Sequence, residues 1–150
     1  MKLLIRPANS ADIPAMMALE RHAATASHWS EQQHRSALDG SPPRRLALVI
    51  EEDSAVCGFL VARNVAAEWE IENIAVAGSA RRRGLGTRLL GEFLNRIRDE
   101  QAAAVFLEVR ESNHAARSLY EKWAFVESGR RSQYYQHPPE DAILYRLDFA

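Results

Sequence analysis

The stretch Ile74–Leu90, which reads IAVAGSARRRGLGTRLL, predicts a phosphate-binding turn between a strand and a helix. An apolar, strand-like run ends at Val76, a short basic loop follows, and an amphipathic helix begins near Leu85. Such a junction directs several backbone N–H groups and the positive end of a helix dipole at one point, where phosphate binds. Gly84 and Gly86 lack a Cβ, so a ligand can approach the backbone closely there.

The same stretch contains a run of three arginines, Arg81, Arg82 and Arg83. Arginine can fork onto phosphate oxygens, which favours a diphosphate-bearing cofactor on this loop. The P-loop signature GxxxxGK[ST] and the dinucleotide signature GxGxxG are both absent from it. A solvated basic turn that merely joins a strand to a helix therefore stays an equal alternative on these residues alone.

Composition limits the classes of protein that this chain can belong to. With 150 residues it is expected to form one domain, residues 1–150, with a sizeable core. A net charge of −1 argues against a general nucleic-acid binder. Cys57 is the only cysteine, no apolar run approaches the ~20 residues of a membrane span, and no signal peptide is visible. A cytoplasmic protein is expected, and the five histidines show no spacing typical of a metal site.

The hydrophobic pattern predicts the element order β-α-α-β-β-β-α-β-α-β-β. The expected strands cover residues 2–6, 46–51, 56–63, 68–76, 104–109, 125–128 and 142–149, and the expected helices cover 13–20, 31–38, 85–98 and 114–122. Capping residues precede the first and last of these helices. Mixed strands and helices around one sheet predict an α/β (α+β) domain of three layers.

Three motifs, in this order and spacing, resemble the GNAT superfamily of acetyl-CoA-dependent N-acetyltransferases. They are the signature Arg81-Arg-Arg-Gly84-Leu-Gly86, the strand Val105–Val109, and the segment Asn113–Phe125 with its Asn-x-x-Ala-x-x-x-Tyr pattern. The resemblance implies a central mixed sheet of about six or seven strands with about four flanking helices.

A closer similarity is to the RimI-type ribosomal-protein-alanine N-acetyltransferases, a subfamily that acetylates protein N-termini. The segments that carry it are Trp29-Ser-Glu31, Leu107–Asn113, Tyr134-Tyr135 and Glu140–Ile143. The chain departs from the family pattern at Gly78, Trp123 and Ala124.

The resemblance implies a binding site for acetyl-CoA along the strand and loop described first. The pyrophosphate is expected on the loop residues Arg81, Arg82, Arg83, Gly84, Leu85, Gly86 and Thr87. The pantetheine arm is expected along the strand edge at Ile74, Ala75 and Val76, with an N–H near Val76 that polarises the thioester carbonyl. Asn113 is expected to contact the same arm, and a helix N-cap is a second role that it can fill at once.

The resemblance also implies two catalytic residues. Glu108 is the expected general base, acting directly or through water, and the alternative is a solvent-facing glutamate paired with Arg110. Tyr120 lies about two helical turns after Asn113 and is the expected general acid for the CoA thiolate. Its alternative is a half-buried tyrosine with its hydroxyl at the surface.

Five further residues are expected near the acceptor. Glu70 and Glu72 could bind or deprotonate the incoming amine, although an exposed strand face explains them equally well. Trp29, Tyr134 and Tyr135 are expected to wall the substrate groove, and ordinary core packing is the alternative for such large aromatics.

Together these residues predict transfer of the acetyl group of acetyl-CoA to the α-amine of a protein N-terminus, with ribosomal proteins that begin with alanine as the implied acceptors. Direct attack in a ternary complex is expected, because no positioned nucleophile is evident in the sequence, and Cys57 alone could contradict this. Acetylation of a lysine or a small amine and a non-catalytic sensor of acyl-CoA stay open as alternatives. No metal and no membrane or nucleic-acid partner are expected, and the oligomeric state is left open.

Overall fold

The computed structural model describes residues 2–22, 28–78 and 84–149. The described residues form seven strands in one sheet of order β1-β2-β3-β4-β5-β7-β6 and four α-helices. The elements are β1 (Leu3–Pro7), the 3-10 helix η1 (Ser10–Asp12), α1 (Ile13–Arg21), α2 (Glu31–Leu38), β2 (Arg45–Glu52), β3 (Ala55–Val65), β4 (Glu68–Val76), α3 (Leu85–Asp99), β5 (Ala104–Arg110), α4 (His114–Lys122), β6 (Val126–Gln136) and β7 (Pro139–Asp148). The element order and the number of strands and helices agree with the sequence prediction.

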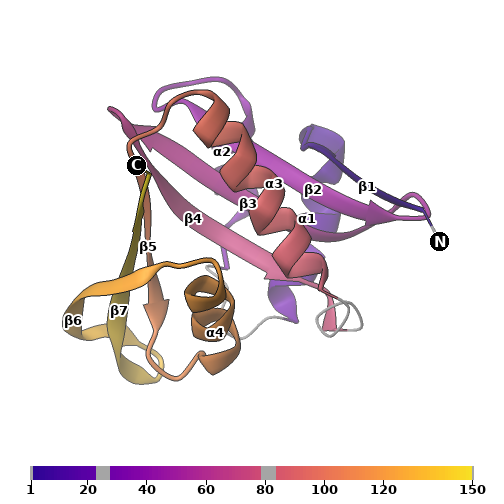
Figure 1. Ribbon diagram of the computed structural model, residues 1–150. Helices are drawn as coiled ribbons and strands as arrows, with labels where there is room; N and C mark the ends of the chain where they lie inside the picture. Colours follow the sequence, from indigo (N-terminus) through magenta and orange to yellow (C-terminus); the bar gives the residue numbers. More distant parts are fainter. Residues whose placement is uncertain (1, 23–27, 79–83, 150) are drawn as a thin grey trace.

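The sheet separates two cores, which makes three layers. On one face α3 and α4 pack over the strands, with α3 lying across β3 and β4 and α4 beside β5 (Figure 1). On the other face Met16 of α1 and Ala37 of α2 pack against Val49, Phe59 and Ala75 of the sheet. Strands alternate their side chains between faces, so neighbouring residues of β2 and β3 serve different cores. The three-layer prediction is confirmed.

A bulge in β4 decides which residues reach which face. The pairing of β3 with β4 joins Val61 to Asn73 and then Ala62 to Ile71, so Glu72 is an extra residue. Before the bulge, odd-numbered residues such as Ile71 face α3. Beyond it Ala75 faces α1, although both are buried. The period-two alternation in the sequence therefore predicts correctly which residues of β4 are buried. It does not predict that the buried residues after the bulge face the opposite side of the sheet from those before it.

The same region separates β4 from β5. Within these two fully described strands, parallel pairing is confined to Glu68–Ala104, Trp69–Val105 and Glu70–Phe106. Beyond these pairs the strands diverge, and Figure 1 shows β4 and β5 as the two arms of a V that opens toward their carboxyl ends. The backbone edges facing this gap lack each other as hydrogen-bond partners, so the gap can receive an extended ligand.

The sequence prediction was wrong about the extent of β6. The strand runs over Val126–Gln136, whereas the pattern predicted residues 125–128. Almost all of it is exposed at the sheet edge, and its residues are mostly polar, so no apolar alternation marks it. The strand forms by pairing with β7, the next strand along the chain, and its exposed polar residues carry no intrinsic strand pattern of their own. Among the described residues, no helix is long and apolar enough to cross a membrane.

Candidate active site

The gap between β4 and β5 is lined on one side by the peptide groups of β4. Ala77 donates its N–H to the carbonyl of Cys57 (2.8 Å), which makes that pair a hydrogen-bonded pair of the β3–β4 ladder. Hydrogen-bonded pairs alternate in antiparallel sheets, so Ala75 also directs its peptide groups toward β3. Ile74 and Val76 therefore direct theirs toward the gap. This is the orientation that an arm pairing with the strand edge requires.

The N-terminus of α3 lies next to the end of β4. Its N-cap, Gly84, has φ +73°, a left-handed conformation that favours glycine, and a Cβ placed there would meet nothing within 4 Å. The first N–H groups of a helix have no intrahelical acceptor, and in α3 these belong to Leu85, Gly86 and Thr87. The backbone here is open and suited to an anion. The predicted contacts at Arg81, Arg82 and Arg83 lie outside the described residues.

Asn113 stands between β5 and α4. Its side-chain oxygen accepts a hydrogen bond from the N–H of Ala116 (3.1 Å), so the predicted N-cap role is confirmed. Its contact with the cofactor arm stays a prediction. The cap fixes the start of α4, the helix that carries Tyr120.

Glu108 lies on β5 with its side chain on the face opposite α4, because Leu107 and Val109 face the α3–α4 core. Its carboxylate forms an ion pair with Arg131 of β6, with Oε1 of Glu108 2.9 Å from Nε of Arg131. The pairing with Arg110 considered from the sequence is wrong. Arg110 instead binds Glu140 (3.3 Å) and stacks over Tyr135, 4.2 Å from the ring centre.

Tyr120 projects from α4 into the α3–α4 core and is only 3% exposed, so the half-buried alternative is wrong. Its ring packs against Phe125 and Tyr145. Burial, and then the neighbouring Tyr135, raises the pKa of the Tyr120 hydroxyl above its ordinary value. The hydroxyl is therefore protonated at neutral pH, and its role as the general acid stays a prediction.

Tyr135 interacts electrostatically with Glu108 on one face of β5 and with Tyr120 on the other. Burial and the Glu108 carboxylate raise the pKa of Tyr135 to about 12, while Arg110 lowers it. Tyr135 is thus within electrostatic range of both Glu108 and Tyr120. Tyr134 is 48% exposed, which rules out the core-packing alternative for that residue. The structure therefore gathers the predicted base, acid and tyrosine pair around the carboxyl end of β5.

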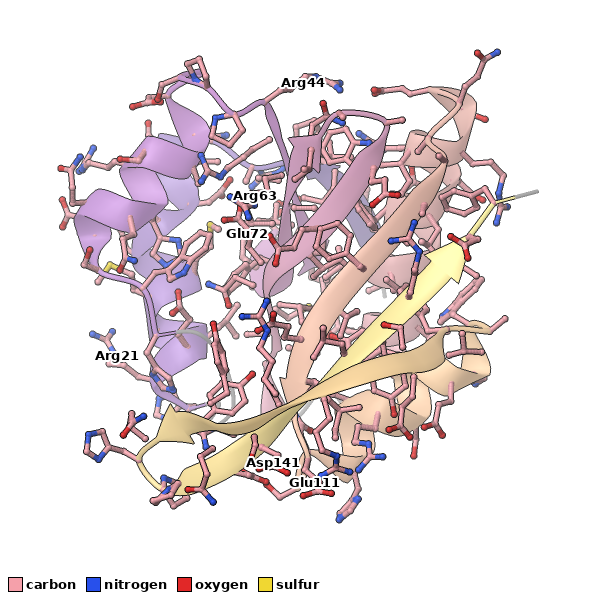
Figure 2. All side chains as sticks on the ribbon, turned by 90° about the vertical axis from the view of Figure 1, so that its left-hand side faces the viewer. Arg21, Arg44, Arg63, Glu72, Glu111 and Asp141 are labelled. Carbon is pink, nitrogen blue, oxygen red and sulfur yellow. The ribbon has the colours of Figure 1, made fainter. Side chains whose placement is uncertain are left out.

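Glu70 and Glu72 lie on the strip of sheet between α1–α2 and the β6–β7 strands, where Figure 2 labels Glu72 beside Arg63. Arg63 binds Glu70 at 2.7 Å, and Arg45 binds Glu72 at 2.9 Å. Both carboxylates are mostly covered, with side chains 20% and 17% exposed. The exposed-face alternative holds only in part, since Glu70 is paired with an arginine of the neighbouring strand β3 and Glu72 with one of β2, the strand beyond it.

Trp29 is held by a buried pair of ionisable side chains. Its backbone N–H donates to Oε2 of Glu20 (2.5 Å), and the other oxygen of Glu20 contacts Nε2 of His34. The Trp29 ring packs edge to face on His34, with centroids 5.4 Å apart, and His34 packs likewise on Phe59. Trp29 thus belongs to the α1–α2 packing, as the alternative proposed, and its place at a substrate groove stays a prediction.

A cavity of about 270 Å³ lies on the face of the sheet that carries Glu108. Its lining includes Glu70, Phe106, Glu108 and Arg131. Sequence reasoning missed Arg131, because it lies on the part of β6 that shows no strand pattern. It also missed the pair of Glu20 and His34, which are 14 positions apart on separate helices. Among the described residues, no group of three or more potential ligands forms a metal site.

Comparisons with known proteins agree with this geometry. The family model described as "Acetyltransferase (GNAT) family" matches residues 13–125. The [ribosomal protein bS18]-alanine N-acetyltransferase of Salmonella typhimurium is 34% identical over 141 residues, 93% of each chain. The crystal structure of the ribosomal-protein-S18-alanine N-acetyltransferase from Escherichia coli superposes with a TM-score of 0.87 and 31% identity, covering 99% of this chain and 95% of that one.

A second solved structure, Ard1 from Thermoplasma volcanium, has a TM-score of 0.90 at 24% identity and covers 100% and 99% of the two chains, which shows the shared fold alone. The chain belongs to the GNAT acetyltransferase family, and it is an N-acetyltransferase. Members of this family use acetyl-CoA as the acetyl donor.

Proposed function

We propose that this enzyme acetylates the N-terminal alanine of ribosomal protein bS18 in the cytoplasm. The proposal is supported by its likeness, over nearly the whole chain, to enzymes named for that reaction. The observation that carries it is the divergence of β4 and β5, with Glu108, Tyr120 and Tyr135 gathered beside the opening.

Acetyl-CoA fits the residues along the gap. When bound, it supplies an acetyl group activated as a thioester. The N–H groups of Leu85, Gly86 and Thr87 at the α3 N-terminus would hold its pyrophosphate, helped by Arg81, Arg82, Arg83 and Gly84. The edge of β4 at Ile74, Ala75 and Val76 would hold the pantetheine arm, and Asn113 would contact that arm from the other side.

Glu108 would take a proton from the acceptor amine, directly or through water, as the amine nitrogen forms its bond to the acetyl carbon. Tyr120 would give its proton to the sulfur as the carbon–sulfur bond breaks. The buried hydroxyl is suited to this because its raised pKa keeps it protonated. Glu108 and Tyr120 lie on opposite faces of β5, so the amine and the thiol would use different entrances.

Direct transfer needs no protein nucleophile. Cys57 donates its thiol hydrogen bond to the carbonyl of Ile50 (3.4 Å) and packs beside the α3 core. Trp29, Tyr134 and Tyr135 would wall the acceptor groove, and Glu70 and Glu72 would lie on its floor. The acceptor would then approach Glu108 on the face of the sheet against which α1 and α2 pack.

The test is release of free thiol from acetyl-CoA by the purified protein. The acceptors are short peptides beginning Ala-Arg, Ser-Arg and Met-Leu, each with a free or an acetylated α-amine and one internal lysine. Release with free N-termini only, strongest for Ala-Arg, would support the proposal. Release with both forms would replace it with lysine acetylation. No release of thiol with any peptide, despite acetyl-CoA binding, would favour a small-amine acceptor or a non-catalytic sensor.

A further inference from the structure

The carboxylate proposed as the general base is already engaged in the ligand-free enzyme. Arg131 reaches from the edge strand β6 and places Nε 2.9 Å from Oε1 of Glu108. The Glu108 side chain is 18% exposed and that of Arg131 is 56% exposed, so the base lies on the floor and the arginine at the rim. Both residues line the 270 Å³ cavity.

The other nearby arginines form ion pairs with carboxylates other than Glu108. Arg63 binds Glu70 at 2.7 Å, and Arg110 binds Glu140 at 3.3 Å. Arg146 binds Glu68 at 2.5 Å and Asp148 at 2.9 Å. Among the described residues, Arg131 is therefore the cation that the structure pairs with Glu108.

The guanidinium of Arg131 and the amine of an acceptor compete for the same group. The α-ammonium of a peptide is a cationic N–H donor, and most of it is protonated near pH 7, because its pKa is about 7.7–8.0. A base that takes this proton directly must contact that nitrogen, and one that acts through a single water must hold that water in the same position. A partly exposed single ion pair contributes little, so an arriving amine can displace Arg131.

Arg131 has a second contact besides Glu108. Its guanidinium carbon lies 5.4 Å from the ring centre of the exposed Tyr134, within cation–π range. The register of β6 on β7 is irregular between Arg131 and Tyr135, and Gln133 has φ +54°. Arg131 itself pairs with Ala142, and the regular β6–β7 ladder is interrupted directly after it.

We propose that Arg131 is a gating residue that occupies the amine position on Glu108 in the free enzyme and gives up this position, while keeping its contact with Tyr134, when a free N-terminus arrives. The inference rests on the proposed role of Glu108. It makes the enzyme selective for an unblocked amine, since only a cation can compete with the guanidinium. The acetylated product carries no such cation, so the ion pair re-forms as the product leaves.

The test compares two ligands by calorimetry on the CoA-bound protein. One is the free-amine peptide beginning Ala-Arg, and the other is its des-amino analogue, with a propionyl group in place of alanine. In Arg131→Gln the Kd of the free-amine peptide should fall about 1.5- to fivefold, and the Kd of the analogue should not change. Arg131→Lys, which keeps the charge, should lie near the wild type.

Arg130→Gln is the matched control, because Arg130 binds Glu111 and Asp141 instead, the two carboxylates labelled together in Figure 2. In Glu108→Gln the further change Arg131→Gln should have no effect on Kd, as a coupled pair requires. An unchanged or higher Kd for the free-amine peptide in Arg131→Gln, or a parallel fall for both ligands, would overturn the gate.

This readout is separate from that of the proposed function. A wild type that releases no thiol with any free N-terminus would contradict the proposed reaction, while the two dissociation constants would still report on Arg131. A wild type that turns over normally, with equal ligand discrimination in Arg131→Gln, would refute the gate and leave the reaction intact.

Discussion

The buried contact between Glu20 and His34 should be among the costliest in the protein to break. Glu20 is 2% exposed and His34 is fully buried. The two oxygens of Glu20 bind Nε2 of His34 and the N–H of Trp29, which joins α1, α2 and the segment before α2. Replacing His34 with alanine removes the partner of one oxygen and leaves that carboxylate in a dry site.

Breaking one partner of a buried ionisable pair typically costs about 3–5 kcal/mol. A domain of this size is stable by about 5–15 kcal/mol, so His34→Ala should remove a large part of the total. With about 2–4 °C for each kcal/mol, the melting temperature should fall by about 10 °C. Urea unfolding with linear extrapolation measures the loss. His34→Gln, which can still donate to Glu20, should lose clearly less.

His114→Ala is the control, because His114 is an exposed histidine on α4, and its effect should stay within about 0.5 kcal/mol. The damage from His34→Ala should also appear in function, as a higher KM for the acceptor peptide with an unchanged KM for acetyl-CoA. A loss below about 1 kcal/mol for His34→Ala would refute the reasoning, because the carboxylate would then have found water or another partner.

Four further predictions test the site and its supports. Glu108→Gln and Tyr120→Phe should each lower kcat about 10²-fold or more in the thiol-release assay, and near-normal turnover would remove those roles. Because burial raises the pKa of Tyr120, kcat should show no fall from this group between about pH 7 and about pH 9.5. An alkaline loss that disappears in Tyr120→Phe would contradict this. Arg6 lowers the pKa of Asp12, so Asp12→Asn should cost about 1–3 kcal/mol at neutral pH. In acid denaturation series that difference should shrink below about pH 4, as the wild-type carboxylate takes up its proton; a constant difference would argue against the ion pair. Gly84→Ala should cost about 1–2 kcal/mol in urea, because its φ is +73° and its surroundings are open, and Gly84→Asn should cost less; equal costs would point to sterics instead of backbone strain.

Local signals explain which parts of this fold could be predicted from sequence. The helix α2 has the bounds that the pattern predicted, because Ser30 forms a capping box with Gln33 at its start. The start of α4 was predicted from Asn113 for the same reason. The β2–β3 turn was also predictable, since Asp53 and Ser54 tolerate the positive φ that it requires. Each of these features is decided within a few residues.

The features that shape the site are decided by contacts between distant residues. The bulge at Glu72 exists only in the register of β4 on β3, and its apolar neighbours alternate as in a regular strand. The ion pair of Glu108 with Arg131 depends on a strand that only β7 pairing creates. The alternative that paired Glu108 with Arg110, two positions further along β5, was therefore wrong, and the actual partner, Arg131, could not be predicted from the local sequence.

The bulge at Glu72 also explains why one strand can serve both substrates. Before it, Glu70 faces the strip of sheet that leads to Glu108, and after it Ile74 and Val76 turn toward the α3 side. The added twist of a bulge moves the end of β4 away from β5, so the peptide edge opens at the point where the side chains change face. The last pair between β4 and β5 joins Glu70 to Phe106 and lies directly before the extra residue Glu72. The opening between the acceptor face and the cofactor face thus begins where the bulge changes the face to which the side chains of β4 point.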